Sequence, residues 1–107
     1  MWVCPILPGP DAARFTMYPM RPGELMVNFG FWDVVHAREP HPAGHFNRLV
    51  EREVRRLGGV KSLYSDSYYD RDEFWEIFDA AGYRRLKQRY DPRGLLGDLF
   101  EKCVLRR

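Results

Sequence analysis

Residues 60–79 read VKSLYSDSYYDRDEFWEIFD, and this stretch decides the class of fold that we expect. Its first half is rich in aromatic residues and favours an extended backbone, so we predict a strand over residues 60–69. Asp70 follows, with Glu73 three residues later, which is the pattern of a capping box at the start of a helix. The stretch therefore predicts a strand that leads directly into a helix.

A second helix is predicted before this stretch, over residues 43–57, because apolar residues recur there at helical spacing. They are Phe46, Leu49, Val50, Val54 and Leu57. Its other face is basic but interleaved with Glu51 and Glu53, so we interpret it as a solvated face rather than a phosphate-binding one. Gly58-Gly59 ends the helix, and we predict that one of the two glycines adopts a positive φ.

Two strands are predicted nearer the N-terminus. Residues 2–7 form a short apolar run that ends at Pro8-Gly9-Pro10. Residues 24–35, ELMVNFGFWDVV, form a longer run, in which Gly30 marks a candidate bulge. A Pro-rich loop connects the two runs.

Helices are predicted for the rest of the chain. Gly82 is expected to interrupt or bend the helix that begins after Asp70, and a second helical stretch follows over residues 83–90. Asp91-Pro92 stops it, and residues 95–104 predict a short terminal helix.

These elements give an α+β fold: a small antiparallel sheet of about three strands in this chain, with helices packed on one face. The 107 residues fit a single domain, residues 1–107. Because two or three strands alone are marginally stable, we expect the sheet to continue with strands that this chain does not contain.

Composition excludes several classes of function. The net charge of +2 is too small to indicate nucleic-acid binding. Cys4 and Cys103 lie far apart and lack zinc-site spacing, so we expect free thiols in a reducing compartment. His36, His41 and His45 lie in or beside one loop, but no carboxylate or Cys joins them at ligand spacing, so no metal site is predicted. The sequence shows no signal peptide and no run of about 20 apolar residues.

The predicted strand over residues 60–69 supplies the candidate site. Alternation places Tyr64, Asp66 and Tyr68 on one face. A Tyr hydroxyl beside a carboxylate can donate or relay a proton to an apolar substrate. The alternative is a half-buried strand whose hydroxyls are simply hydrogen-bonded. Spacing alone leaves both interpretations open.

Residues 60–79 and the closing residues 90–104, YDPRGLLGDLFEKCV, resemble the end of a known family. It is the 24-dehydrocholesterol reductase (Diminuto) branch of the vanillyl-alcohol-oxidase flavoproteins, the Δ24-sterol reductases. The resemblance is strongest over residues 64–75 and 101–103, and the opening WVCPILP also resembles a strand of that family's substrate domain. Residues 11–38 depart most from the family pattern.

The resemblance implies that this chain is the C-terminal part of a flavoenzyme cap domain, without the FAD-binding domain. In such enzymes FAD lies in an N-terminal domain, NADPH is a candidate electron donor, and a hydride passes from flavin N5 to a C=C bond. The implied partners are an apolar small molecule such as a sterol and the N-terminal FAD-binding domain. Tyr64, Asp66 and Tyr68 would then be substrate-binding residues. No FAD-binding residue can be assigned in this chain, and we expect the chain alone to bind no FAD and to be inactive.

Other functions remain open at this point. Within the same superfamily, the parent could oxidise a sugar alcohol or a lactone instead. Outside it, the chain could be a non-catalytic binding or interaction module that uses an exposed sheet edge. We expect the parent to be cytoplasmic, or to associate with a membrane surface through regions outside this chain. A homodimer is a further expectation.

Overall fold

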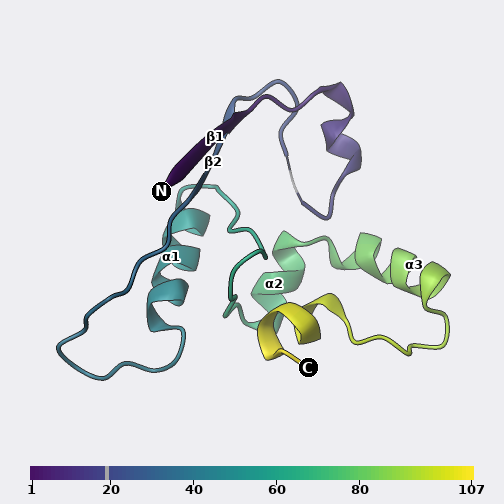
Figure 1. Cartoon of the computed structure of the whole chain (residues 1–107). Coiled ribbons are helices and arrows are strands. Elements are labelled where there is room, and N and C mark those ends of the chain that lie inside the picture. The colour runs from purple at the N-terminus through teal and green to yellow at the C-terminus, as the bar shows by residue number, and fades with distance from the viewer. Residues whose placement is uncertain (19) are drawn as a thin grey trace. The chain divides into compact units, whose positions relative to one another are not determined.

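Strands β1 (Trp2–Ile6) and β2 (Met26–Gly30) pair antiparallel in this computed structural model, which describes residues 1–18 and 20–107 (Figure 1). A 3₁₀ turn, η1 (Pro10–Arg14), lies in the connection between them. The strands belong to the first of two compact units, Met1–His41 and Pro42–Arg107. Each unit is described on its own below.

Gly30 is a regularly paired strand residue and not the bulge that its position suggested, because it lies directly opposite Trp2 in an unbroken register. A Cβ built on Gly30 would lie 2.3 Å from Nε1 of Trp2, so the indole occupies the space that a side chain would need. The glycine therefore makes room for the ring of its cross-strand partner.

Helix α1 (His45–Arg56) forms where the apolar spacing predicted it. Gly58, with φ of 74°, follows the helix, which confirms the predicted positive φ. Its backbone N–H donates to the carbonyl of Arg55, and that of Gly59 donates to the carbonyl of Val54. These two bonds form a Schellman motif, which satisfies carbonyls that the last turn leaves open.

Residues 60–69 are not a strand, so this prediction was wrong. Their backbone groups bond to side chains instead of to a neighbouring strand. The Asp66 carbonyl accepts from Asn47 Nδ2 at 3.0 Å and from Lys61 Nζ at 2.6 Å. The Tyr68 N–H donates to the carboxylate of Glu51 at 2.9 Å. Asn47 and Glu51 of α1 supply partners that a neighbouring strand would have supplied.

Helix α2 (Arg71–Ile77) begins as the capping pattern predicted, since the Asp70 carboxylate accepts from the Glu73 N–H at 2.8 Å. It ends before Asp79, and α3 (Ala80–Tyr90) begins there, so the break does not lie at Gly82. The Asp79 carboxylate caps α3 by accepting from the Gly82 N–H at 2.9 Å. A Cβ on Gly82 would lie 2.2 Å from that carboxylate, so the glycine serves the cap.

The core of the second unit is aromatic. Phe74 of α2 lies 4.7 Å from Phe78 and 5.3 Å from Phe100 between ring centroids, and Tyr69 contacts the first two of these rings. All four side chains are at most 5% exposed. A π-helical turn, η2 (Glu101–Leu105), follows Phe100 and shortens the predicted terminal helix; it lies beside α2 (yellow in Figure 1). This cluster packs Phe100, near the C-terminus, against α2.

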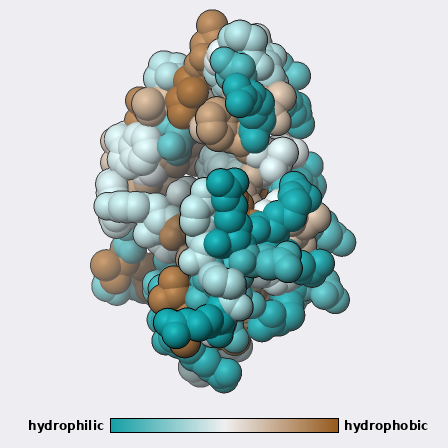
Figure 2. Space-filling view, turned by 90° about the vertical axis from the view of Figure 1, so that its right-hand side faces the viewer, coloured by the Kyte–Doolittle hydropathy of each residue, from teal (hydrophilic) through white to brown (hydrophobic). Residues whose placement is uncertain are grey.

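The α+β class is thus confirmed, with two strands in the sheet instead of about three. The sheet lies in one unit and helices α1 to α3 in the other, so the packing of helices on one face of the sheet stays a prediction. Hydrophobic residues also reach the surface, as separate brown patches among hydrophilic ones in Figure 2. No helix within the described residues is both long and apolar enough to cross a bilayer.

Candidate functional site

A buried carboxylate organises the region that carries the predicted site residues. Glu51 of α1 is fully buried, although it lies on the basic face that we interpreted as solvated. Its Oε1 accepts from the Tyr68 N–H at 2.9 Å and from Lys61 Nζ at 3.3 Å. Its Oε2 accepts from Arg48 at 2.9 Å. Two cations and a backbone N–H together compensate the desolvation of this one anion.

We call residues 61–68 the site segment. Besides Glu51, the Lys61 ammonium contacts the Asp66 carbonyl and the Ser67 hydroxyl, so this one side chain joins α1 to the middle of the segment. Lys61 is 11% exposed at its side chain. The segment is therefore held by charge-assisted bonds from a rigid helix, although it has no secondary structure of its own.

Tyr68 is fixed at three places. Its ring packs against Gly44, where a built Cβ would lie 2.3 Å from the ring atoms. Its N–H is bonded to Glu51, as described above. Its hydroxyl accepts from the Arg106 guanidinium at 2.9 Å, and the same guanidinium nitrogen lies 2.9 Å from Oδ2 of Asp66. The hydroxyl proton of Tyr68 is thus left to be donated elsewhere.

The predicted trio is only partly brought together. Asp66 and Tyr68 meet through Arg106, from the far end of the chain. Tyr64 lies in a turn with 87% of its surface exposed, and its backbone N–H donates to the Ser62 hydroxyl. Tyr64 therefore shares the segment with the other two residues but not their cluster.

The basic face of α1 extends the ion-pair network toward α2. Arg48 lies 2.8 Å from Oε2 of Glu73 as well as bonding Glu51. Arg55 pairs with Glu73 at 3.4 Å and with Glu76 at 2.6 Å. These contacts join the two helices, so the interpretation of this face as fully solvated was wrong for Arg48 and Glu51. The alternation of opposite charges in the sequence was the pattern that could have indicated such pairing.

Burial also affects a neighbouring phenol. Burial, with the negative charges of Glu51 and Glu73 as further causes, raises the pKa of Tyr69 to about 12. Arg48 lies over the same ring, 5.8 Å from its centroid. Tyr69 is therefore a neutral core residue at physiological pH and is not part of the exposed cluster.

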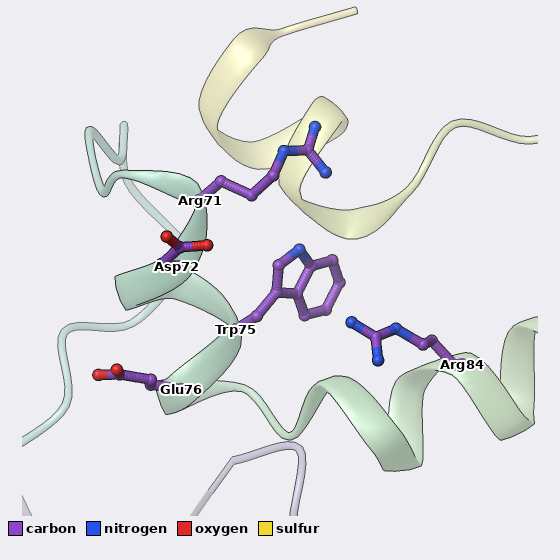
Figure 3. Close-up of a pocket in the computed structure, with 5 residues that line it drawn as sticks. All are labelled: Arg71, Asp72, Trp75, Glu76 and Arg84. Atoms are coloured by element: carbon purple, nitrogen blue, oxygen red, sulfur yellow. The ribbon is translucent and has the colours of Figure 1, made fainter.

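A second surface feature lies between α2 and α3. It is an open depression of about 420 Å³, lined by Arg71, Asp72, Trp75, Glu76 and Arg84. Figure 3 shows the Trp75 indole flanked by the Arg71 and Arg84 side chains, whereas Glu76 points away from it. The indole also packs on the Tyr83 ring at 4.9 Å. Sequence reasoning did not identify this depression, because it depends on the turn between two helices.

The residues of this chain do not by themselves fit a bound FAD. The depression beside Trp75 carries two carboxylates and two guanidinium groups, so its charges balance and it offers no net positive charge to a diphosphate. Another, of about 480 Å³, is lined by Leu7, Pro8, Gly9, Pro10, Pro22 and Gly23, none of which has a charged side chain. Among the described residues, no group of three or more His, Cys, Asp or Glu side chains gathers as a metal site requires.

Comparison with known proteins gives one consistent result. No family model matches the chain, and no solved structure matches it. Human Δ24-sterol reductase is 29% identical over 104 residues, which cover 95% of this chain and 19% of the human protein. The rat and mouse Δ24-sterol reductases are 27% identical over 111 residues, with the same two shares.

The resemblance stated from the sequence is thus confirmed, and it extends over nearly the whole chain. The chain spans about a fifth of the length of the curated relatives that it matches. It is therefore a sterol-reductase-like segment.

Proposed function

We propose that this chain is the C-terminal, substrate-side segment of an FAD-dependent reductase that reduces a C=C bond of a sterol or a similar apolar alkene. The observation that supports this proposal is the similarity to Δ24-sterol reductases along 95% of the chain. The flavin belongs, in this proposal, to a domain outside the chain. NADPH is the proposed source of electrons, and the flavin supplies the hydride when it is bound.

The chain's own contribution is to bind and orient the substrate. The Tyr68 hydroxyl, held by Arg106, can donate its proton to a polar group or developing charge on the substrate. Asp66 holds the same guanidinium and so fixes its direction. Tyr64 is exposed, so a sterol can stack against its ring or accept a hydrogen bond from its hydroxyl. We therefore assign Tyr64, Asp66 and Tyr68 as substrate-binding residues.

The first unit supports a role as part of a larger assembly. Val3, Val27 and Phe29 lie on one face of the two-stranded sheet, and each is more than 50% exposed. A two-stranded sheet with an uncovered apolar face is marginal in water. We propose that the remaining cap and the FAD-binding domain of the parent cover this face, so that residues 1–107 are one part of the cap domain. A homodimer and association of the parent with a membrane surface stay predictions.

The test is a chimera in which this chain replaces the matched segment of human Δ24-sterol reductase. Purified chimera is given NADPH and a Δ24-unsaturated sterol, and the reduced sterol is measured by mass spectrometry. We expect turnover together with bound FAD. The matched control lacks the segment altogether and is expected to be inactive.

A chimera that retains FAD but reduces no more sterol than the deletion control would contradict the proposal. Supplying sugar alcohols and lactones under oxidising conditions tests the alternative within the superfamily. The 107-residue chain alone is the second control, and we expect it to retain no flavin after dialysis.

A further inference from the structure

We propose that Glu51 is a positioning residue: it holds the site segment, and with it Asp66 and Tyr68, in the conformation that meets the substrate. The inference rests on the proposed function for its substrate, but its structural part can be tested in the chain alone. Sequence reasoning assigned Glu51 to a solvated helix face, and neither the resemblance nor the comparisons assign it a role.

The contacts of Glu51 are directed at the segment. Oε1 receives both the Tyr68 N–H and the Lys61 ammonium, and that ammonium in turn bonds the Asp66 carbonyl. This one carboxylate oxygen therefore bonds Tyr68 directly, and it is connected to Asp66 through the ammonium group of Lys61. Helix α1 gives Glu51 a rigid base from which it contacts both Tyr68 and Lys61.

A carboxylate with no role beyond filling space would be an unfavourable choice at this position. Burying an anion is costly, and a well-packed apolar side chain of similar size is often as stable as a buried ion pair. The ionised group adds directional hydrogen bonds to a segment that belongs to no helix or strand. This is the reason to assign Glu51 to the ordering of the segment and not only to the stability of the fold.

Glu53 provides a matched control. It lies on the same helix, two residues away, and pairs with Arg56 at 2.9 Å. Its side chain is 62% exposed and contacts no residue of the site segment in any bond described for it. Glu53→Gln therefore removes the same charge from the same helix without touching the segment.

The first experiment measures backbone amide exchange in the 107-residue chain by NMR. In Glu51→Gln, the Tyr68 amide is expected to exchange about tenfold faster relative to the amides of α1, because a neutral oxygen accepts a weaker bond than a carboxylate. Glu53→Gln should leave the Tyr68 amide unchanged. If Glu51→Gln does not fold, Lys61→Met is measured in its place. In that variant we expect the amides of Ser67 and Tyr68 to exchange roughly threefold faster.

Equal acceleration of Tyr68 and of the α1 amides would assign Glu51 to global stability alone and overturn the proposal. An unchanged Tyr68 amide in the folded variant would do the same. A selective effect at the site segment supports it.

The second experiment places the same variants in the chimera with human Δ24-sterol reductase. Glu51→Gln is expected to lower kcat/KM for the sterol at least tenfold, while bound FAD and the unfolding temperature match those of Glu53→Gln. An active wild-type chimera in which Glu51→Gln is as active as Glu53→Gln overturns the positioning role and leaves the proposed function intact. An FAD-loaded but inactive wild-type chimera overturns the proposed function instead, and the amide exchange then decides the positioning role.

Discussion

The phenol ring of Tyr68 lies directly against the backbone of Gly44, in space that a Cβ atom would fill at 2.3 Å from the ring. Gly44 also has φ of 76°, which places it in the left-handed region at the start of α1. Packing and backbone conformation therefore both require glycine at this position.

Gly44→Ala is expected to destabilise the chain by about 2–3 kcal/mol. Roughly 1 kcal/mol comes from the left-handed backbone and the remainder from displacement of the Tyr68 ring. Gly94→Ala is the matched control, because Gly94 has φ of 62° but open space around its Cα. It should cost about 1 kcal/mol in the same denaturant titration. Equal losses in the two variants would show that the ring does not rest on Gly44.

Tyr69 predicts a loss of stability at alkaline pH. Burial raises its pKa to about 12 in the folded chain, whereas an exposed Tyr has a pKa of 10.0. The neutral phenol therefore stabilises the fold fully below pH 10, and this contribution is lost as pH rises from 10 through 12. The unfolding temperature of the wild type should fall more steeply across this range than that of Tyr69→Phe. Tyr64→Phe, which removes an exposed phenol, is the control, and parallel curves for wild type and Tyr69→Phe would contradict the assignment.

The lowered pKa of Asp91 predicts a loss of stability at acidic pH. The Lys87 ammonium, followed by the N–H groups of Leu96 and Leu95, lowers the pKa of Asp91 from 3.8 to about 2. Its stabilising contribution is therefore present above about pH 4 and is lost as pH falls through 2. Asp91→Asn should unfold at a lower temperature than the wild type at pH 7, and the difference should vanish near pH 2. A difference in unfolding temperature that stays constant from about pH 7 to about pH 2 would argue against a stabilising role of the ionised Asp91 carboxylate.

The Tyr64→Phe variant distinguishes a substrate-binding role of Tyr64 from a structural one. Because its side chain is 87% exposed, Tyr64→Phe should change the free energy of unfolding by less than about 0.5 kcal/mol. In the chimera with human Δ24-sterol reductase, a hydroxyl that bonds the sterol predicts lower kcat/KM at an unchanged unfolding temperature. Wild-type kinetics in a folded Tyr64→Phe would remove its hydroxyl from the site.

Much of the second unit could be predicted from local patterns. The apolar spacing located α1, Gly58 ended it, and Asp70 capped α2 as expected. These features depend on residues at most five apart in sequence, and their physical causes are local. The resemblance to sterol reductases also followed from short strings within residues 60–104.

The wrong predictions for residues 60–69 and for Glu51 have a common cause, which is hydrogen bonding between residues that are far apart in the sequence. Residues 60–69 have the composition of a strand, but Glu51 and Asn47 provide the partners for their backbone groups. Glu51 looked solvated because its neighbours in sequence are charged, and only the fold brings Lys61 and Tyr68 to it. Nothing local indicates that Arg106 lies beside Tyr68, 38 residues away. Contacts of this kind depend on the tertiary structure.

We propose that the site segment lies on the substrate side of a sterol reductase, and photolabelling is the most direct test of this position. The chimera with bound FAD is irradiated with a Δ24-sterol that carries a diazirine, digested, and mapped by mass spectrometry. We expect labelling within residues 60–69 that excess unlabelled sterol suppresses, and weaker labelling in Glu51→Gln than in Glu53→Gln. Competed labels that fall only outside residues 1–107 would contradict it.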